Sequence, residues 1–199
     1  MKPETCHYHL GTCREDEFAH KVCFQPHIVY LANSSALKIG ITRIVNMPTR
    51  WLDQGATQAL PILKVGSRRL SGHLETLFGT QIADKTDWRK LLKGEAEPLN
   101  LIEQRDQILE EFAPKIQTIR DEFSQNLEFN EELEFLEHEL PKEFIYPVEQ
   151  YPEKIKSLNL DKTPKIRGVL HGIKGQYLLL DIGVINIRKY TGYEMILRT

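Results

Sequence analysis

The chain has 199 residues, of which 41% are hydrophobic and 27% are charged, as is typical of soluble globular proteins. This length allows one full core with an appendage, or two small domains. No stretch approaches the roughly 20 apolar residues that a membrane helix needs, and the N-terminal residues contain no apolar run of the kind found in signal peptides. We therefore expect a cytoplasmic protein with no membrane partner.

The net charge of −2 conceals a strong segregation of charge along the chain. Residues 1–80 carry nine Lys and Arg against six Asp and Glu, residues 101–153 carry four against fifteen, and residues 154–199 carry nine against three. Two basic ends on either side of an acidic middle argue against a protein that coats nucleic acid uniformly. The pattern allows anion binding at either end, whereas the acidic segment would repel phosphates.

Residues 1–26 form a segment that is rich in cysteine and histidine and shows little periodicity. Cys6, Cys13 and Cys23 lie in it, and an imidazole such as that of His20 would complete a tetrahedral zinc site with three thiolates. No Cys-x-x-Cys pair is present, although that pair carries most of the specificity of zinc-ribbon motifs. Zinc binding and ordinary burial of these side chains therefore both stay open.

Residues 27–83 predict a small α+β unit. Residues 27–31 and 37–42 are β-rich runs separated by the turn composition ANSSA, and they predict a hairpin. Pro48 lies near the start of a predicted helix that Gly55 ends or interrupts. The run PILKVGS predicts a third strand, and helical spacing of the apolar residues in RRLSGHLETLFGTQIA predicts a second helix.

Residues 84–153 predict a helical, acidic region. Thr86 or Asp87 is suited to cap a helix that begins at Trp88. Farther along, apolar residues mark an amphipathic helix that Pro114 would kink or divide. The charges of the tract NEELEFLEHELPKEF favour a solvated helix face or a connector between domains.

Residues 154–199 predict a small β module, because short β runs cut by glycines follow Pro164 and each is too short to stand alone. A Gly-rich loop that cradles phosphate needs a helix after it, and HGIKGQYLLLD is followed by β runs instead. The whole sequence thus predicts an α+β fold with four parts: a Cys/His-rich segment, a mixed α/β domain, a helical connector and a β module.

The segment 27–78 resembles the GIY-YIG nuclease superfamily in the order of its polar groups. The run VYL, which contains Tyr30, stands where that family has GIY, and the run KIG, which contains Lys38 and Gly40, stands where it has YIG. The form KIGIT occurs in a subset of GIY-YIG-like domains. The resemblance implies a mixed α/β fold of the GIY-YIG type for residues 27–83.

Two further residues extend the resemblance. Arg50 lies ten residues beyond Gly40, where the family carries its phosphate-binding arginine, and Glu75 matches the family's metal-ligating glutamate. The polar helix residue four positions beyond the arginine is usually Tyr or His in the family and is Gln54 here. Lys38 replaces the family's second tyrosine, so two of the five expected groups differ.

The resemblance implies nucleic-acid binding with Mg²⁺-dependent phosphodiester cleavage. Glu75 would hold one Mg²⁺ against a phosphate oxygen, and Arg50 would contact the same phosphate. Tyr30 would orient or deprotonate water, which a tyrosine with its ordinary pKa of about 10 does poorly near pH 7. Lys38 would lower that pKa or contact the phosphate itself.

Each of these residues also has a purely structural interpretation. Tyr30 in an apolar strand is often a half-buried core aromatic, and Arg50 beside Trp51 could stack on the indole or pair with Glu75. The alternative function is therefore a non-catalytic module, stabilised by zinc, that binds nucleic acid or protein and kept the fold after losing the base.

The segments CHYHLGTCRE, TRWLDQGA, DKTDWRKLL and GIKGQYLLLDIGVINIRKYTGY also resemble a family of uncharacterised proteins that share all four over roughly residues 3–195. This resemblance brings no established activity. Longer members carry further cysteine pairs ahead of the segment that starts this chain, which implies that residues 1–26 hold only part of a zinc site.

Overall fold

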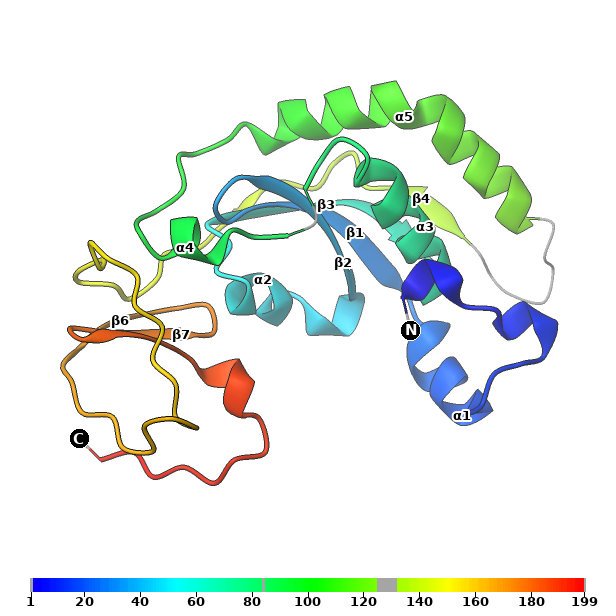
Figure 1. Ribbon diagram of the computed structural model, residues 1–199. Coiled ribbons are helices and arrows are strands. Elements are labelled where there is room, and N and C mark those ends of the chain that lie inside the picture. The colour runs from blue at the N-terminus through cyan, green and yellow to red at the C-terminus, as the bar shows by residue number, and fades with distance from the viewer. Residues whose placement is uncertain (1, 84, 125–131, 199) are drawn as a thin grey trace.

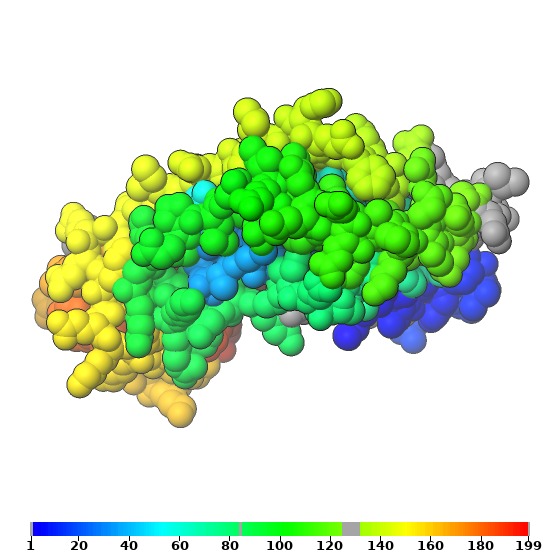
Figure 2. All heavy atoms as spheres, turned by 90° about the horizontal axis from the view of Figure 1, so that it is seen from above, coloured from blue at the N-terminus to red at the C-terminus, as the bar shows by residue number. Residues whose placement is uncertain are grey.

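Two antiparallel β-sheets organise the chain, which has the predicted α+β fold (Figure 1). The computed structural model describes residues 2–83, 85–124 and 132–198. Seen from above, the N-terminal segment and the C-terminal module lie at opposite ends of the molecule (Figure 2). None of the helices in the described ranges is long and apolar enough to cross a membrane.

The first sheet is built on the predicted hairpin. Strands β1 (His27–Asn33) and β2 (Leu37–Arg43) pair antiparallel, and β3 (Gln58–Val65) pairs with the other edge of β1. All seven residues of β1 are buried, because helices cover both faces of the strand. This burial explains why HIVYLAN reads as a nearly continuous apolar run and not as an alternating one.

One face of the sheet packs against α3 (Arg68–Phe78) and α5 (Leu101–Ser124). The hydroxyl of Ser67 caps α3 by accepting a hydrogen bond from the backbone N–H of Leu70 at 3.1 Å. The rings of Phe78 and Phe112 meet edge to face, with centroids 5.3 Å apart, where the two helices cross. Pro114 lies inside α5, so it does not divide the helix.

The opposite face of the sheet packs against α2 (Thr49–Asp53), which follows the short turn η4 (Ile44–Asn46). Trp51 of α2 is fully buried and meets the ring of Tyr30 edge to face at 5.8 Å. The helix ends at the predicted glycine, Gly55, whose φ of 68° lies in the left-handed region. The hydroxyl of Tyr146 holds this end by donating to the carbonyl of Ala56 at 2.9 Å.

The region 84–153 is helical only in its first part. Helix α4 (Trp88–Leu91) begins as predicted, with the Asp87 carboxylate accepting from the first backbone N–H groups. In the second part, β4 (Leu133–Phe135) and β5 (Lys142–Glu143) pair with β3. Much of the acidic tract, which we expected to form a solvated helix or a connector, thus extends the first sheet; its first two residues lie outside the described ranges. Acidic composition indicates exposure, and an edge strand satisfies exposure as well as a helix does.

The C-terminal module is the predicted small β unit. Strands β6 (Leu170–Lys174), β7 (Tyr177–Leu180) and β8 (Gly183–Asn186) form a three-stranded antiparallel meander, and the turn η5 (Ile187–Tyr190) follows it. The rings of Tyr177 and Trp88 stack nearly parallel, with centroids 6.1 Å apart, and join the module to α4.

A buried lysine anchors the module to the rest of the chain. Lys174 has no exposed surface, and its ammonium donates to the carbonyl of Gly94 at 2.9 Å and to the hydroxyl of Tyr151 at 3.2 Å. Burial lowers the pKa of Lys174, and the charge of Glu95 opposes that shift. These bonds join residues that are 80 and 23 positions apart in the chain, so the position of the module depends on non-local contacts.

The N-terminal segment consists of short turns, η1 (Pro3–Thr5), η2 (Tyr8–Leu10), α1 (Asp16–Phe18) and η3 (Ala19–Cys23). A Cβ atom on Gly72 of α3 would lie 2.5 Å from Pro3, so the backbone of η1 packs directly against that helix. The segment is therefore part of the same packed unit as the first sheet.

The β6–β7 turn packs closely against α2, which gives a test of this docking. Gly175 has a φ of 57°, and a Cβ atom there would lie 2.8 Å from the carbonyl oxygen of Asp53 and 2.9 Å from the backbone nitrogen of Gly55. Gly11 has a similar φ of 67°, but a Cβ atom there would meet nothing within 4 Å, so this glycine serves as the matched control.

We expect Gly11→Ala to lower the free energy of unfolding by about 1–2 kcal/mol through backbone strain alone. Gly175→Ala should cost about 1–3 kcal/mol more, because its methyl group also collides with α2. Urea denaturation followed by circular dichroism measures both values. An equal loss of unfolding free energy in the two variants would show that the module does not pack against α2 at Gly175.

Candidate functional site

The register of the hairpin places the ring of Tyr30 over the backbone of Gly40. Tyr30 of β1 stands opposite Gly40 of β2, and a Cβ atom on Gly40 would lie 2.7 Å from both Cζ and Oη of the tyrosine ring. Only glycine leaves room for a phenol in this position. The two motif residues that carry the GIY-YIG resemblance are therefore in direct contact.

The two residues that depart from the family pattern contact each other. Lys38 is two residues before Gly40 on the same face of β2, and its ammonium donates to Oε1 of Gln54 at the end of α2. The hydroxyl of Tyr30 donates to the same oxygen at 3.0 Å. Tyr30 and Lys38 are 0% and 4% exposed, and Gln54 is half-buried, so the two donors are almost wholly removed from solvent.

All four predicted site residues meet in one pocket. Tyr30, Lys38, Arg50 and Glu75 line a cavity of about 380 Å³, together with Gln54. Arg50 and Glu75 are half-buried, and the charge of each affects the pKa of Tyr30. Burial raises the pKa of Tyr30; the charge and hydrogen bond of Arg50 oppose this shift, and the charge of Glu75 adds to it.

Three further residues of the pocket were not identified from the sequence. Arg43 ends β2, Arg68 begins α3, and His27 begins β1. Arg68 could have been identified from the sequence, because it precedes Glu75 by seven residues. This spacing places both side chains on one side of α3, two turns apart. With Lys38 and Arg50, these arginines give the pocket four cationic side chains against the single carboxylate of Glu75.

His27 adds a neutral imidazole to the wall. The side chain is 3% exposed, and burial lowers its pKa, an effect to which the charges of Arg68 and Arg43 add. Its Nδ1 lies 2.6 Å from the carbonyl oxygen of Gln25. A carbonyl can only accept a hydrogen bond, so Nδ1 carries the proton and Nε2 carries the lone pair.

The predicted zinc ligands lie near one another without forming a metal centre. Cys6 and Cys23 are half-buried and Cys13 is exposed, and no group of three or more Cys, His, Asp or Glu side chains in the described ranges is arranged to hold a metal ion. The His20 ring packs against Phe24, with centroids 5.5 Å apart. Burial raises the pKa of the Cys23 thiol, although a zinc ligand must be a thiolate. Zinc binding stays a prediction.

The depressed pKa of His27 predicts a pH-dependent stability. Above its ordinary pKa of about 6.5 the imidazole is neutral in both the folded and the unfolded chain. Below that pH the unfolded chain takes up a proton first, so the free energy of unfolding falls as pH falls toward the folded-state pKa. We expect His27→Gln to reduce the loss of stability between about pH 7.5 and about pH 5.5, by up to about 1.4 kcal/mol for each pH unit of the shift.

Guanidinium denaturation at the two pH values measures the effect, and His138→Gln, at an exposed position, is the control. The same pH dependence in the wild type and in His27→Gln would contradict the assignment of a neutral buried imidazole.

Comparison with known proteins supports the broader of the two resemblances. A family model described as "Protein of unknown function (DUF2797)" matches residues 1–195. No curated protein and no solved structure matches the chain, so the GIY-YIG likeness rests on the motifs and on their convergence in the pocket. Because the match covers nearly the whole length, the chain belongs to the DUF2797 family of proteins of unknown function.

Proposed function

We propose that the pocket between β2, α2 and α3 binds a phosphodiester group of nucleic acid and cleaves it with the help of Mg²⁺. The observation that carries this proposal is the convergence of four cationic side chains and one carboxylate around the buried Tyr30. A cavity with this excess of positive charge attracts anions. Each charged contact is stronger there than in bulk water, because the local dielectric constant is lower.

Arg50 is the residue best placed to hold the phosphate. Its guanidinium is half-buried, lies against the phenol of Tyr30 and faces the cavity. A planar guanidinium binds two phosphate oxygens at once, which fixes the orientation of the group as well as its position. Arg43 and Arg68 line the same cavity and supply further positive charge.

Glu75 fits the role of the single Mg²⁺ ligand. Mg²⁺ in phosphoryl-transfer sites is commonly held by one or two carboxylates together with substrate phosphate and water, so the half-buried carboxylate of Glu75 in this pocket suits it. The ion, when bound, would neutralise charge that develops on the phosphate. Glu75 would also balance part of the positive charge of the cavity.

Tyr30 fits the role of a hydrogen-bond donor better than that of a base. Its pKa is raised by burial, so the phenol is protonated at neutral pH and donates to Gln54. In this proposal the Tyr30 hydroxyl exchanges Gln54 for a phosphate oxygen when the substrate binds, and so orients the phosphate. His27, neutral and with Nε2 unprotonated, supplies the proton acceptor that the tyrosine does not.

A second candidate function is a binding module without catalysis. The observation that favours it is the mutual contact of Lys38 and Gln54. These residues stand in place of the family's second tyrosine and of its polar helix residue, which is usually Tyr or His. Such a module would still bind phosphate through Arg50, and its affinity for nucleic acid would not depend on Glu75.

Arg50→Ala and Glu75→Gln separate these functions. We expect Arg50→Ala to lower the affinity for nucleic acid at least about tenfold, because it removes a charged hydrogen-bond donor to the phosphate. We expect Glu75→Gln to abolish cleavage, because the variant loses the carboxylate that would hold the metal. Binding in EDTA should be undiminished, because a carboxylate does not attract an anionic phosphate when the metal is absent. Arg120→Ala, at an exposed position on α5, is the charge control.

Fluorescence anisotropy with labelled single-stranded, duplex and branched DNA and RNA measures binding, and denaturing gels with Mg²⁺ or Mn²⁺ measure cleavage. Binding that needs Arg50 without any cleavage supports the non-catalytic module. An Arg50→Ala protein that binds as tightly as the wild type would overturn both functions.

A further inference from the structure

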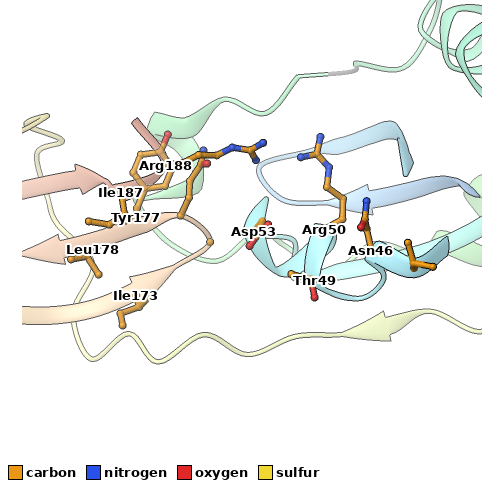
Figure 3. A pocket seen from close by; sticks show the side chains of 12 residues that line it. Asn46, Thr49, Arg50, Asp53, Ile173, Tyr177, Leu178, Ile187 and Arg188 are labelled. Carbon is orange, nitrogen blue, oxygen red and sulfur yellow. The ribbon is translucent and has the colours of Figure 1, made fainter. Parts of the chain in front are cut away.

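A second, larger cavity adjoins the phosphate pocket. This cleft, of about 730 Å³, lies between α2 on one side and the C-terminal module on the other (Figure 3). It shares Arg50 and Asn46 with the phosphate pocket, so the two cavities meet at the proposed phosphate-binding arginine. Its volume falls within the range of about 300–1,000 Å³ that is usual for small-molecule sites.

Two arginines face each other across this cleft. Arg50 extends from α2 and Arg188 extends from η5, and Figure 3 shows the two guanidinium groups pointing toward one another. Within the described ranges neither guanidinium makes an ion pair, although the carboxylate of Asp53 lies on the wall of the cleft. Two facing guanidinium groups repel each other, and bound anions offset this repulsion, so the arrangement suits phosphate groups in the cleft.

The rest of the lining is suited to a base or a sugar. Val45 and Ile173 line the cleft and are 75% and 41% exposed, which is unusual for side chains of this kind. Leu178 and Ile187 continue the apolar surface on the side of the C-terminal module. A cationic clamp beside an apolar wall matches the two parts of a nucleotide, which has a charged phosphate and a flat base with an apolar face.

The position of η5, which carries Arg188, depends on how the C-terminal module packs against the rest of the chain. The close approach of Gly175 to Asp53 and the buried hydrogen bonds of Lys174 hold the module against the first sheet. The two arginines are therefore presented on packed elements whose separation is set before a ligand arrives. Such preorganisation lowers the entropic cost of binding.

We propose that the cleft holds one unpaired nucleotide next to the phosphodiester bound in the first pocket, with Arg188 contacting the phosphate on the far side of that nucleotide. This inference rests on the proposed function and specifies its substrate. A base inside a duplex is paired and stacked and must be extruded before it can enter such a cleft. The preferred substrate is therefore single-stranded nucleic acid, or a duplex with an unpaired nucleotide at the bound phosphodiester.

Arg188→Ala tests the clamp, and Lys189→Ala is its matched control because Lys189 is an exposed neighbour that lines neither cavity. The probes are a fluorescein-labelled single strand and the blunt duplex of the same sequence, measured by anisotropy in EDTA over a series of salt concentrations. Thr49→Trp is a second variant, since Thr49 is exposed and lines only the larger cleft.

We expect the wild type to bind the single strand more tightly than the duplex. Arg188→Ala should lower single-strand affinity about tenfold. It should also reduce the slope of log K against log salt by about 0.7, the value for one lost phosphate contact on a single strand. Thr49→Trp should weaken single-strand binding by filling the space for the base, and Lys189→Ala should change neither affinity nor slope.

The inference is overturned if Arg188→Ala matches Lys189→Ala, if Thr49→Trp binds the single strand as the wild type does, or if the wild type prefers the duplex. If Arg50→Ala still loses binding in those cases, the proposed phosphate pocket stands and only the nucleotide cleft fails. If Arg50→Ala binds as the wild type does, or if the wild type binds no nucleic acid at all, both the proposed function and this inference fail.

Discussion

The contact between the Tyr30 ring and the backbone of Gly40 is the constraint on which the site depends. The phenol can lie flat against β2 only because Gly40 has no side chain. Once it lies there, its hydroxyl reaches Gln54 at the end of α2, and Lys38 reaches the same amide from the same face of β2. Arg50, one helical turn before Gln54, is thereby brought to the pocket. The absence of a side chain at Gly40 thus determines how the hairpin and α2 pack against each other.

The charge segregation of the sequence acquires a spatial meaning in this fold. The long helix α5, which carries much of the acidic middle of the chain, packs on the face of the sheet opposite α2 (Figure 1). The cationic residues of the pocket come from β2, α2 and α3, and Arg188 comes from the basic C-terminal module. An acidic surface on one side and basic cavities on the other would direct a polyanion toward α2.

Arg50 connects the two cavities and therefore the two ends of the chain. On one side it lines the pocket with Pro3 and Val22 of the N-terminal segment, and on the other it faces the C-terminal module. The residues matched by the family model, 1–195, include both of these flanking segments. The flanking segments contribute walls to the cavities as well as stability.

The sequence predicted those parts of the fold that are determined by local patterns. The hairpin, the helix around Glu75 and the Asp87 cap follow from strand composition, helical spacing and capping chemistry, and they are present. Convergence of Tyr30, Lys38, Arg50 and Glu75 followed from the order of the motifs. The roles of these residues stay proposals, because order and proximity do not determine chemistry.

The features that could not be predicted depend on non-local contacts. Strand β4 forms because β3 has an open edge, which the acidic tract itself does not reveal. Burial of Lys174 depends on Gly94 and Tyr151, which are distant in sequence. The cleft between Arg50 and Arg188 exists only after the module docks, so no spacing along the chain could indicate it.

The central claim is that Arg50 and Glu75 face one bound phosphodiester. A crystal structure with Mn²⁺ and a short single-stranded phosphorothioate oligonucleotide tests this claim most directly. We expect a phosphate oxygen in contact with the Arg50 guanidinium and an anomalous Mn²⁺ signal at the Glu75 carboxylate. An oligonucleotide bound elsewhere on the surface, with the pocket around Tyr30 holding neither phosphate nor metal, would contradict it.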